Sequence, residues 1–251
     1  MTQEIILGID EVGRGPWAGP LVVGAVILKR PVDPIVDTTS LKISTDDPWQ
    51  DLNDSKKLTA KRRTELDQTI RKYASAYAIG WVSATELDQY GLSAALKLAT
   101  RRAVKQILAQ KALFTSIIID GTVNFLKNTP LEGRVSTLAK ADGLIPEVSA
   151  ASIIAKVARD AYMTKLTTKY PSYGFEKHVG YGTKLHRDSL EKYGICPEHR
   201  LSFRPVAKIA QAYPDRTFNS DASQNASNPQ KNSIFTKFGL QSHSAKSPKS
   251  S

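Results

Sequence analysis

An apolar run that ends in carboxylates and then glycine lies near the start of this chain, and it constrains the fold more than any other feature. Residues 5–7 are apolar and rich in β-branched side chains, which predicts a buried strand, and Asp10 and Glu11 follow. Because neighbouring residues of a strand point to opposite faces, both carboxylates converge on one site only where the strand ends. Two carboxylates held close repel each other unless a cation such as Mg²⁺ lies between them. The alternative is a polar turn with exposed acidic side chains.

The pattern of an apolar run followed by a carboxylate and then glycine occurs twice more in the chain. Residues 116–121 form an apolar run that ends in Asp-Gly, and a further predicted strand at 135–140 leads to Asp-Gly at 142–143. In an open α/β sheet ligands bind at strand ends, and carboxylates without a His or Cys cluster favour a hard divalent cation over zinc or iron. Two such ions about 4 Å apart activate water for phosphodiester cleavage. The candidate metal-binding and catalytic residues are Asp10, Glu11, Asp120 and Asp142. The alternative is that Asp120 and Asp142 merely begin Asp-Gly turns, which are common.

The remaining pattern predicts an α/β fold with one large domain. Further strands are predicted at residues 21–28 and 76–82, and residues 31–51 are expected to form a long surface loop. Helices are predicted at about residues 59–73, 93–110, 148–169, 184–193 and 205–213, with a short helix opened by a capping box at 83–86. Ser149 is the expected cap of the 148–169 helix, and the glycine-aromatic stretch 173–183 is expected to be a loop.

The composition limits the class of binding partner and the cellular compartment that we expect for this protein. The net charge of +11 favours a polyanionic partner, either nucleic acid or an anionic membrane surface. The longest apolar run, residues 21–28, is too short to span a bilayer, and no basic-then-apolar leader precedes the first strand. The single cysteine, Cys196, cannot form an internal disulfide. We therefore expect a cytoplasmic protein without membrane association, acting as a monomer.

The composition changes near residue 214, where Ser, Asn, Gln and Lys replace large apolar residues. This change predicts a folded domain over residues 1–213 and a disordered basic tail over 214–251. Within the tail, Ile234, Phe235 and Phe238 form an isolated apolar cluster that we expect to dock on a replication clamp.

Several segments together resemble the bacterial ribonuclease HII family. They occur in the family's order over about residues 5–210. The segments are residues 8–16, 52–58, 119–121, 149–160, 173–175, 178–181 and 202–206. The resemblance implies an RNase H-like fold in which helices flank a central mixed β-sheet, followed by a helical C-terminal portion.

The resemblance also implies an activity. Members of the family are metal-dependent endoribonucleases that cut the RNA strand of RNA/DNA hybrids. They also cut 5′ of single ribonucleotides embedded in duplex DNA, which is the first step of ribonucleotide excision repair, and leave a 3′-OH and a 5′-phosphate. The four acids of the family bind Mg²⁺ or Mn²⁺ and map onto the four candidates above. Around Asp142 the chain has Lys-Ala-Asp-Gly where the family usually has Lys-Gly-Asp-Ser.

The resemblance assigns substrate contacts as well. The family's Gly-Arg-Gly backbone, which reads the ribose 2′-OH, maps onto Gly13, Arg14 and Gly15, and the tyrosine that packs on the following deoxyribose maps onto Tyr181. Physical chemistry supports both roles. The 2′-OH alone distinguishes RNA from DNA, backbone groups reach it only where no side chain intervenes, and an aromatic ring lies flat only on a sugar without a 2′-OH.

Basic residues and histidines leave more than one interpretation open. Lys56 and Lys57 are candidate phosphate contacts, or simply a solvated pair. The basic positions of the 93–110 helix either line a duplex channel or face solvent; they are Lys97, Arg101, Arg102 and Lys105. His178 and His186 could serve as general acids, but exposed loop histidines are usually inert, and we expect that of these two.

Two other functions compete with this interpretation. One is a two-metal DNA nuclease or strand transferase of the same fold. The other is a hybrid-binding module without catalytic activity.

Overall fold

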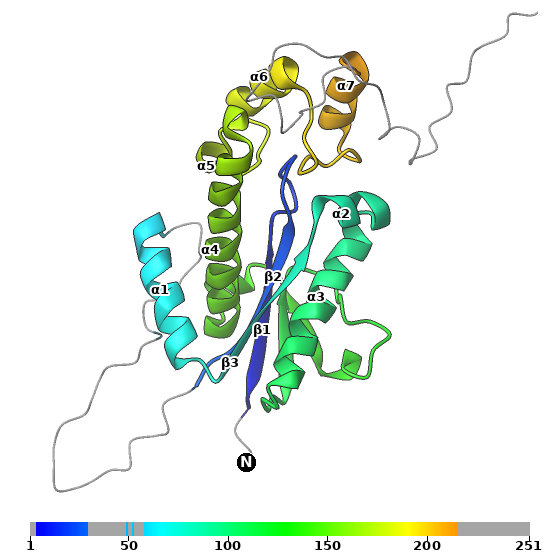
Figure 1. Ribbon diagram of the computed structural model, residues 1–251. Coiled ribbons are helices and arrows are strands. Elements are labelled where there is room, and N and C mark those ends of the chain that lie inside the picture. Colours follow the sequence, from blue (N-terminus) through cyan, green and yellow to red (C-terminus); the bar gives the residue numbers. More distant parts are fainter. Residues whose placement is uncertain (1–3, 30–48, 50–51, 53–57, 215–251) are drawn as a thin grey trace, which may run out of the picture. The chain divides into compact units, whose positions relative to one another are not determined.

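A five-stranded mixed sheet forms the centre of the computed structural model, which describes residues 4–29, 49, 52 and 58–214 (Figure 1). The strands are β1 (Ile6–Val12), β2 (Leu21–Ile27), β3 (Ala76–Val82), β4 (Ser116–Asp120) and β5 (Val135–Leu138). Their order is β3-β2-β1-β4-β5, so β1 occupies the middle. It pairs antiparallel with β2 and parallel with β4. The predicted mixed α/β sheet is confirmed.

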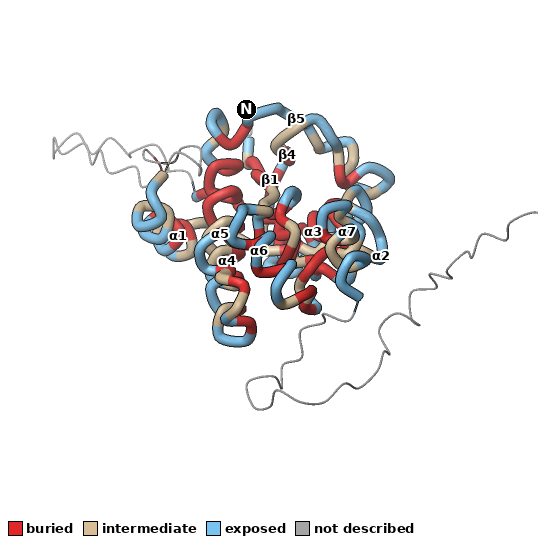
Figure 2. Tube along the Cα trace, turned by 90° about the horizontal axis from the view of Figure 1, so that it is seen from above, coloured by how far each residue is buried: buried red, intermediate tan, exposed pale blue. Residues whose placement is uncertain are grey.

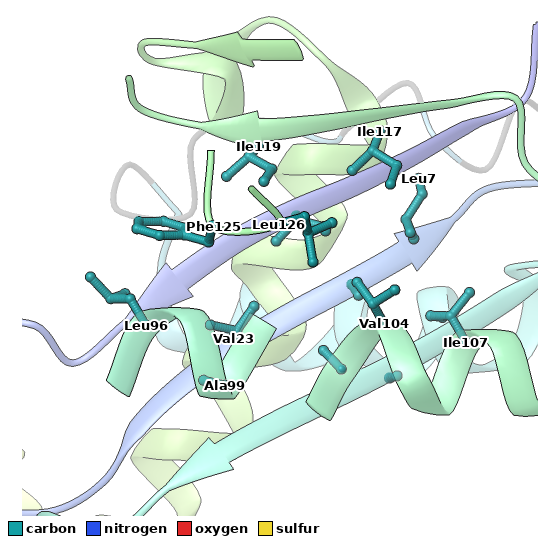
Figure 3. Close-up of a cluster of buried hydrophobic side chains, with 14 of the residues drawn as sticks. Leu7, Val23, Leu96, Ala99, Val104, Ile107, Ile117, Ile119, Phe125 and Leu126 are labelled. Atoms are coloured by element: carbon teal, nitrogen blue, oxygen red, sulfur yellow. The ribbon is translucent and has the colours of Figure 1, made fainter. Parts of the chain in front are cut away.

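One long helix covers each face of this sheet. Helix α3 (Leu92–Ala109) packs on the side to which Leu7 and Val23 point, in the cluster of buried hydrophobic side chains drawn in Figure 3. Helix α4 (Pro146–Lys169) packs on the other side, where Val26 contacts its apolar residues. Alternate residues of a strand point to opposite faces, so the uninterrupted apolar β2 serves both layers. Seen from above, buried residues lie along β1 and the inner sides of α3 and α4 (Figure 2).

Glycines let the two helices approach the sheet to backbone contact. A Cβ added at Gly24 in β2 would overlap the carbonyl oxygen of Ala151 in α4, and one at Gly8 would overlap the backbone of Glu147. On the opposite face, a Cβ at Gly80 would overlap the backbone of α3. Side chains larger than hydrogen at these positions would hold the helices away from the strands.

The C-terminal portion is helical, as predicted. Besides α3 and α4, the helices are α1 (Ala60–Tyr73), α2 (Ala84–Tyr90), α5 (Phe175–His178), α6 (Lys184–Tyr193) and α7 (Arg204–Ala212). Short 3₁₀ turns lie at η1 (Glu132–Arg134), η2 (Ala141–Gly143) and η3 (Pro171–Tyr173). Helix α5 packs beside the C-terminal half of α4, where Thr167 donates to Glu176, and helices α6 and α7 lie above the turn that joins β1 to β2 in Figure 1. Within the described residues, no helix combines the length and apolarity that crossing a bilayer requires.

The predictions made from short sequence motifs at helix ends and loops were confirmed in one case and wrong, wholly or in part, in two others. The capping box is confirmed, because the Glu86 N–H donates to Ser83 Oγ at 3.1 Å and the Ser83 N–H donates to Glu86 Oε2 at 3.0 Å. The predicted start of α4 is wrong: the helix begins at Pro146, whose fixed φ suits a first turn, and Ser149 is a buried helical residue instead of the cap. The predicted 173–183 loop contains α5, so that prediction is wrong in part.

Other predictions fall on parts of the chain that the structure does not describe. The loop at 31–51 lies outside the described residues apart from Trp49, and so does the tail from residue 215.

Candidate active site

Asp10 lies near the carboxyl end of β1, and its side chain is buried close to the carboxylates of Glu11 and Asp120. Ile9 pairs with Ile119 in the parallel β1–β4 ladder, so Asp10 and Asp120 follow at the ends of adjacent strands. Burial, together with the negative charges of Glu11 and Asp120, raises the pKa of Asp10 to about 8. The Glu11 N–H donates to Asp10 Oδ1 at 2.7 Å and opposes this shift only in part. The protein therefore holds Asp10 where its negative charge is unfavourable unless a cation compensates it.

Asp120 connects this strand end to Asp142. The N–H of Ala141 donates to Asp120 Oδ1 with 2.7 Å between the atoms, and Asp142 follows in η2 with a buried side chain. Lys140 has the left-handed φ of 62° that turns the chain back after β5. The peptide before Asp142 is thus attached directly to Asp120, and both acids stand at ends of parallel strands.

The acids fit a hard cation by their chemistry. Every donor is a carboxylate oxygen, and the pKa of Asp10 is raised by burial and by repulsion from Glu11 and Asp120, both of which a bound divalent ion would offset. Within the described part of the chain, no three His, Cys, Asp or Glu side chains are already gathered closely enough to hold a metal ion. Glu11 instead accepts a hydrogen bond from Arg14 Nη1, with 3.1 Å to its Oε1.

The Gly-Arg-Gly stretch follows β1 and faces Tyr181. Gly13 has φ +93°, a conformation that favours glycine, and a Cβ there would lie 2.5 Å from Arg159 Nε. Gly15 is exposed, and the one atom within 4 Å of a Cβ added there would be Tyr181 Cε1, at 3.8 Å, among the described residues. The Tyr181 side chain is itself 46% exposed. The backbone at Gly15 is therefore open to a ligand that also touches Tyr181.

The family sequence model described as ribonuclease HII matches residues 7–206. The chain belongs to the ribonuclease HII family. It is 44% identical over 200 residues to ribonuclease HII of Shewanella halifaxensis (strain HAW-EB4), covering 79% of this chain and 87% of that protein. It is 40% identical to ribonuclease HII of Polynucleobacter asymbioticus (strain DSM 18221 / CIP 109841 / QLW-P1DMWA-1), covering 84% and 98% of the two chains.

Solved structures confirm the RNase H-like fold. The crystal structure of ribonuclease H2 from Pyrococcus horikoshii OT3 matches with a TM-score of 0.66 and 26% identity, covering 84% of this chain and 99% of that one. Ribonuclease HII of Archaeoglobus fulgidus, whose structure is a complex with PCNA, matches with a TM-score of 0.61 and 29% identity over 80% and 95% of the chains. The present chain is accordingly a ribonuclease of this family.

Two buried arginines, which the sequence did not single out, fix the Gly-Arg-Gly loop of this ribonuclease. Arg159 donates to the carbonyl oxygens of Pro20, Ala18 and Val179 at 2.9, 3.0 and 2.9 Å. Arg200 donates twice to Gly19 O and once to Arg14 O. Burial lowers the pKa of Arg159 to about 10 and that of Arg200 to about 9, so both remain charged at neutral pH.

These arginines place two positive charges beneath the loop that follows β1. In the described part of the chain, all their hydrogen bonds go to backbone carbonyl oxygens. These hydrogen bonds hold the carbonyl groups of the loop turned toward the protein interior. Arg159 lies inside the 149–160 motif, but a basic residue in a helix is ordinarily expected on its solvent face, so no sequence signal marks its burial.

The histidines were predicted as exposed, and that prediction is wrong. His178 is 5% exposed and His186 is 0% exposed, and both lie beneath the loop that carries Tyr181. Burial lowers the pKa of His186 to about 4 and that of a third buried histidine, His199, to about 3; it also lowers the pKa of His178. All three rings are therefore neutral at neutral pH. The sequence around these histidines is rich in glycine and polar residues, so it does not indicate that their side chains are buried.

The basic candidates divide into three groups. Arg102 is held by Glu86, with 2.7 Å between Nη2 and Oε1, and by the Trp81 carbonyl. The other basic positions of α3 are exposed; they are Lys97, Arg101 and Lys105. Lys56 and Lys57 lie outside the described residues.

Proposed function

We propose that this ribonuclease is a metal-dependent endonuclease that cleaves the RNA strand of RNA/DNA hybrids and cuts 5′ of single ribonucleotides in duplex DNA. Cleavage leaves a 3′-OH and a 5′-phosphate. The observation that carries the proposal is the exposed Gly15 backbone facing Tyr181, on the loop that follows Asp10 and Glu11. The Gly15 backbone could thus contact a ribose, and Tyr181 the neighbouring sugar, on the loop that follows the acidic residues.

Asp10, Glu11, Asp120 and Asp142 would hold Mg²⁺ or Mn²⁺. When bound, such an ion activates water and neutralises charge on the phosphodiester. Burial of Asp10 beside Glu11 and Asp120 supports this assignment, because the same arrangement without a cation raises the pKa of Asp10 to about 8. The Ala141 N–H holds Asp120 in place, and Glu11 is reachable from Arg14.

Substrate recognition falls to the backbone of Gly13, Arg14 and Gly15 and to the ring of Tyr181. Peptide groups at glycine can donate to and accept from a 2′-OH, which no deoxyribose offers. Tyr181 then packs on the next sugar, where a missing 2′-OH leaves a flat face. We also propose that Lys56 and Lys57 bind phosphates, a contribution that does not depend on base sequence and weakens as salt rises. The net charge of +11 supports such contacts.

Three matched duplexes test the proposed activity. They share one sequence and are all DNA, DNA with one ribonucleotide, and an RNA/DNA hybrid, each incubated with Mg²⁺, with Mn²⁺ or with a chelator. We expect metal-dependent cleavage of the last two only, 5′ of the ribonucleotide in the second. Cleavage of the all-DNA duplex would instead support a DNA nuclease or strand transferase. Binding without turnover would support a hybrid-binding module.

Tyr181→Ala is expected to reduce cleavage at a single ribonucleotide by about tenfold more than cleavage of a long hybrid. The reason is that an RNA-to-DNA junction occurs at every single-ribonucleotide site, whereas most sites in a hybrid lack one, and stacking on an aromatic ring is worth about 1–3 kcal/mol. Steady-state kcat/KM on the two substrates measures this difference. An equal loss on both would contradict the role given to Tyr181.

We further propose that the tail binds a sliding clamp through Ile234, Phe235 and Phe238, which lie outside the described residues. The structure of the Archaeoglobus fulgidus relative in complex with PCNA supports this partner class. Removing residues 214–251 is expected to abolish binding to the bacterial clamp in a pull-down of purified proteins. Cleavage of the single-ribonucleotide duplex serves as the control and should persist. Unchanged clamp binding after the deletion would refute the proposal.

A further inference from the structure

Three buried histidines form a connected chain beneath Tyr181. His178 ends α5, His186 lies in α6, and His199 lies between α6 and α7. The rings of His178 and His186 stack with 4.4 Å between their centroids. His186 Nε2 lies 3.0 Å from His199 Nε2, and His186 Nδ1 lies 3.0 Å from the carbonyl oxygen of Tyr181. The chain therefore ends on the peptide of a residue that faces Gly15.

The partners of His186 and His199 allow one arrangement of protons. The Tyr181 carbonyl only accepts, so His186 must carry its proton on Nδ1. A neutral imidazole has a single N–H, and His186 Nε2 is then an acceptor that needs the Nε2–H of His199. His199 Nδ1 is left as an acceptor, and the N–H of Cys196 donates to it at 2.9 Å. The Cys196 carbonyl oxygen also lies 3.2 Å from this Nδ1, but it accepts instead from the backbone N–H of His199 at 2.9 Å. Each bond in the chain requires the one before it.

His178 completes the support from the other side. Its Nε2 lies 2.8 Å from the Tyr173 carbonyl oxygen, so Nε2 carries the proton, and the Gly180 N–H donates to its Nδ1 at 3.2 Å. The N–H of Tyr181 donates to the His178 carbonyl oxygen at 2.9 Å. Hydrogen bonds therefore fix the backbone of Tyr181 at both its N–H and its carbonyl group.

We propose that His186, with its proton placed by His199, is a positioning residue that sets the preference of this ribonuclease for RNA–DNA junctions. The Tyr181 carbonyl accepts from the Thr183 N–H at 2.8 Å and from the Nδ1–H of His186, and the second bond is the side-chain contact that holds the tyrosine ring opposite Gly15. This inference rests on the proposed function, in which Tyr181 contacts the sugar that follows the ribonucleotide. His186 itself touches neither substrate nor metal.

The proton arrangement can be measured on the unaltered full-length chain. It contains four histidines, of which the fourth is His243 in the tail. Long-range ¹H–¹⁵N correlation spectra at neutral pH distinguish the two neutral tautomers of each ring. We expect the Nδ1–H form for His186 and the Nε2–H form for His199 and His178. An Nε2–H or a charged His186 would overturn the inference without any variant having to fold.

Two substitutions of His186 then separate its two hydrogen bonds. Asparagine places an amide donor near the position of Nδ1 and keeps the bond to Tyr181, whereas glutamine places its amide near Nε2 and keeps only the contact to His199. The readout is the ratio of kcat/KM on a single-ribonucleotide duplex to that on a long hybrid. We expect His186→Gln to lower the ratio about tenfold, the loss of one positioning hydrogen bond, and His186→Asn to keep it within about twofold. Equal ratios in the two variants would overturn the proposal.

Leu190→Ala is the matched control for lost packing. Leu190 lies one turn after His186 on α6 and is fully buried. It belongs to the hydrophobic cluster that contains Phe175, whose ring contacts His186, without taking part in the histidine chain. We expect its substitution to lower Tm while leaving the substrate ratio unchanged. A lowered ratio in Leu190→Ala would show that loosened packing alone explains the effect.

Tyr181→Ala tells the two proposals apart. If it leaves the substrate ratio unchanged, the role of Tyr181 in the proposed function fails. If it lowers the ratio while His186→Gln does not, only the positioning role of His186 fails.

Discussion

Asp10→Asn is expected to abolish cleavage, by on the order of 10³-fold or more, while leaving duplex binding nearly unchanged. The amide is similar in size to the carboxylate but cannot carry its charge, so the cluster with Glu11 and Asp120 loses much of its attraction for a divalent cation. Duplex binding should persist because Asp10 is buried and the backbone at Gly15 is open. The same substitution replaces a carboxyl group whose ionised form is unfavourable without metal by a neutral amide, so the free energy of unfolding in a chelator should not decrease.

Single-turnover kinetics measure the expected loss of cleavage, and fluorescence-anisotropy titration of the same duplex measures the expected retention of binding. Asp120→Asn should behave alike, since Asp120 shares the strand end with Asp10. Asp188→Asn is the matched control, because Asp188 pairs with Lys184 on the exposed side of α6 and such pairs contribute little to stability. Cleavage by Asp10→Asn at a rate near that of Asp188→Asn would contradict the placement of the metal at the end of β1.

The sheet and the ends of its strands were predictable because their signals are local. An apolar run followed by Asp at 116–120 predicts a strand and its end within a few residues, and the parallel pairing of β1 with β4 then places Asp120 beside Asp10. The register between the two strands is not local, but a shift by one residue would turn Ile117 and Ile119 away from the core. Burial of alternate apolar residues therefore constrains where the acids lie.

The buried arginines and histidines that support the loops of the site were not predictable, because their contacts are distant in the sequence. Arg159 donates to Pro20, which is 139 residues away, and Arg200 donates to Gly19 across 181 residues. Which carbonyls turn inward depends on how α4 and the chain after α6 meet the loop that follows β1. His186 likewise lies in a short polar helix, and its burial follows from contacts with His178 and His199 instead of from any periodicity. Polar residues buried by distant backbone leave no pattern in the sequence.

Gly24→Ala is expected to destabilise the protein by about 3 kcal/mol or more, one of the largest effects of a single added methyl group. Gly24 pairs with Asp10 on one side and Ile79 on the other, so β2 cannot move without breaking two ladders. The new Cβ would overlap the carbonyl oxygen of Ala151, which is backbone of α4 and has no rotamer to change. Helix α4 must therefore shift away from the sheet and lose apolar contact along its length.

Urea denaturation of Gly24→Ala beside Gly133→Ala isolates this effect. Gly133 lies in η1 with no atom of the described residues within 4 Å of an added Cβ and without a positive φ, so its substitution should change stability by about 0.5 kcal/mol at most. Helix α4 also carries Ser152, which hydrogen-bonds to Asp10, and Arg159, which holds the loop after β1. Any folded Gly24→Ala protein should accordingly cleave more slowly than Gly133→Ala at equal occupancy of the folded state. Equal stability of the two variants would mean that α4 does not rest on the backbone of β2, and the acids would then lack the support on which their placement depends.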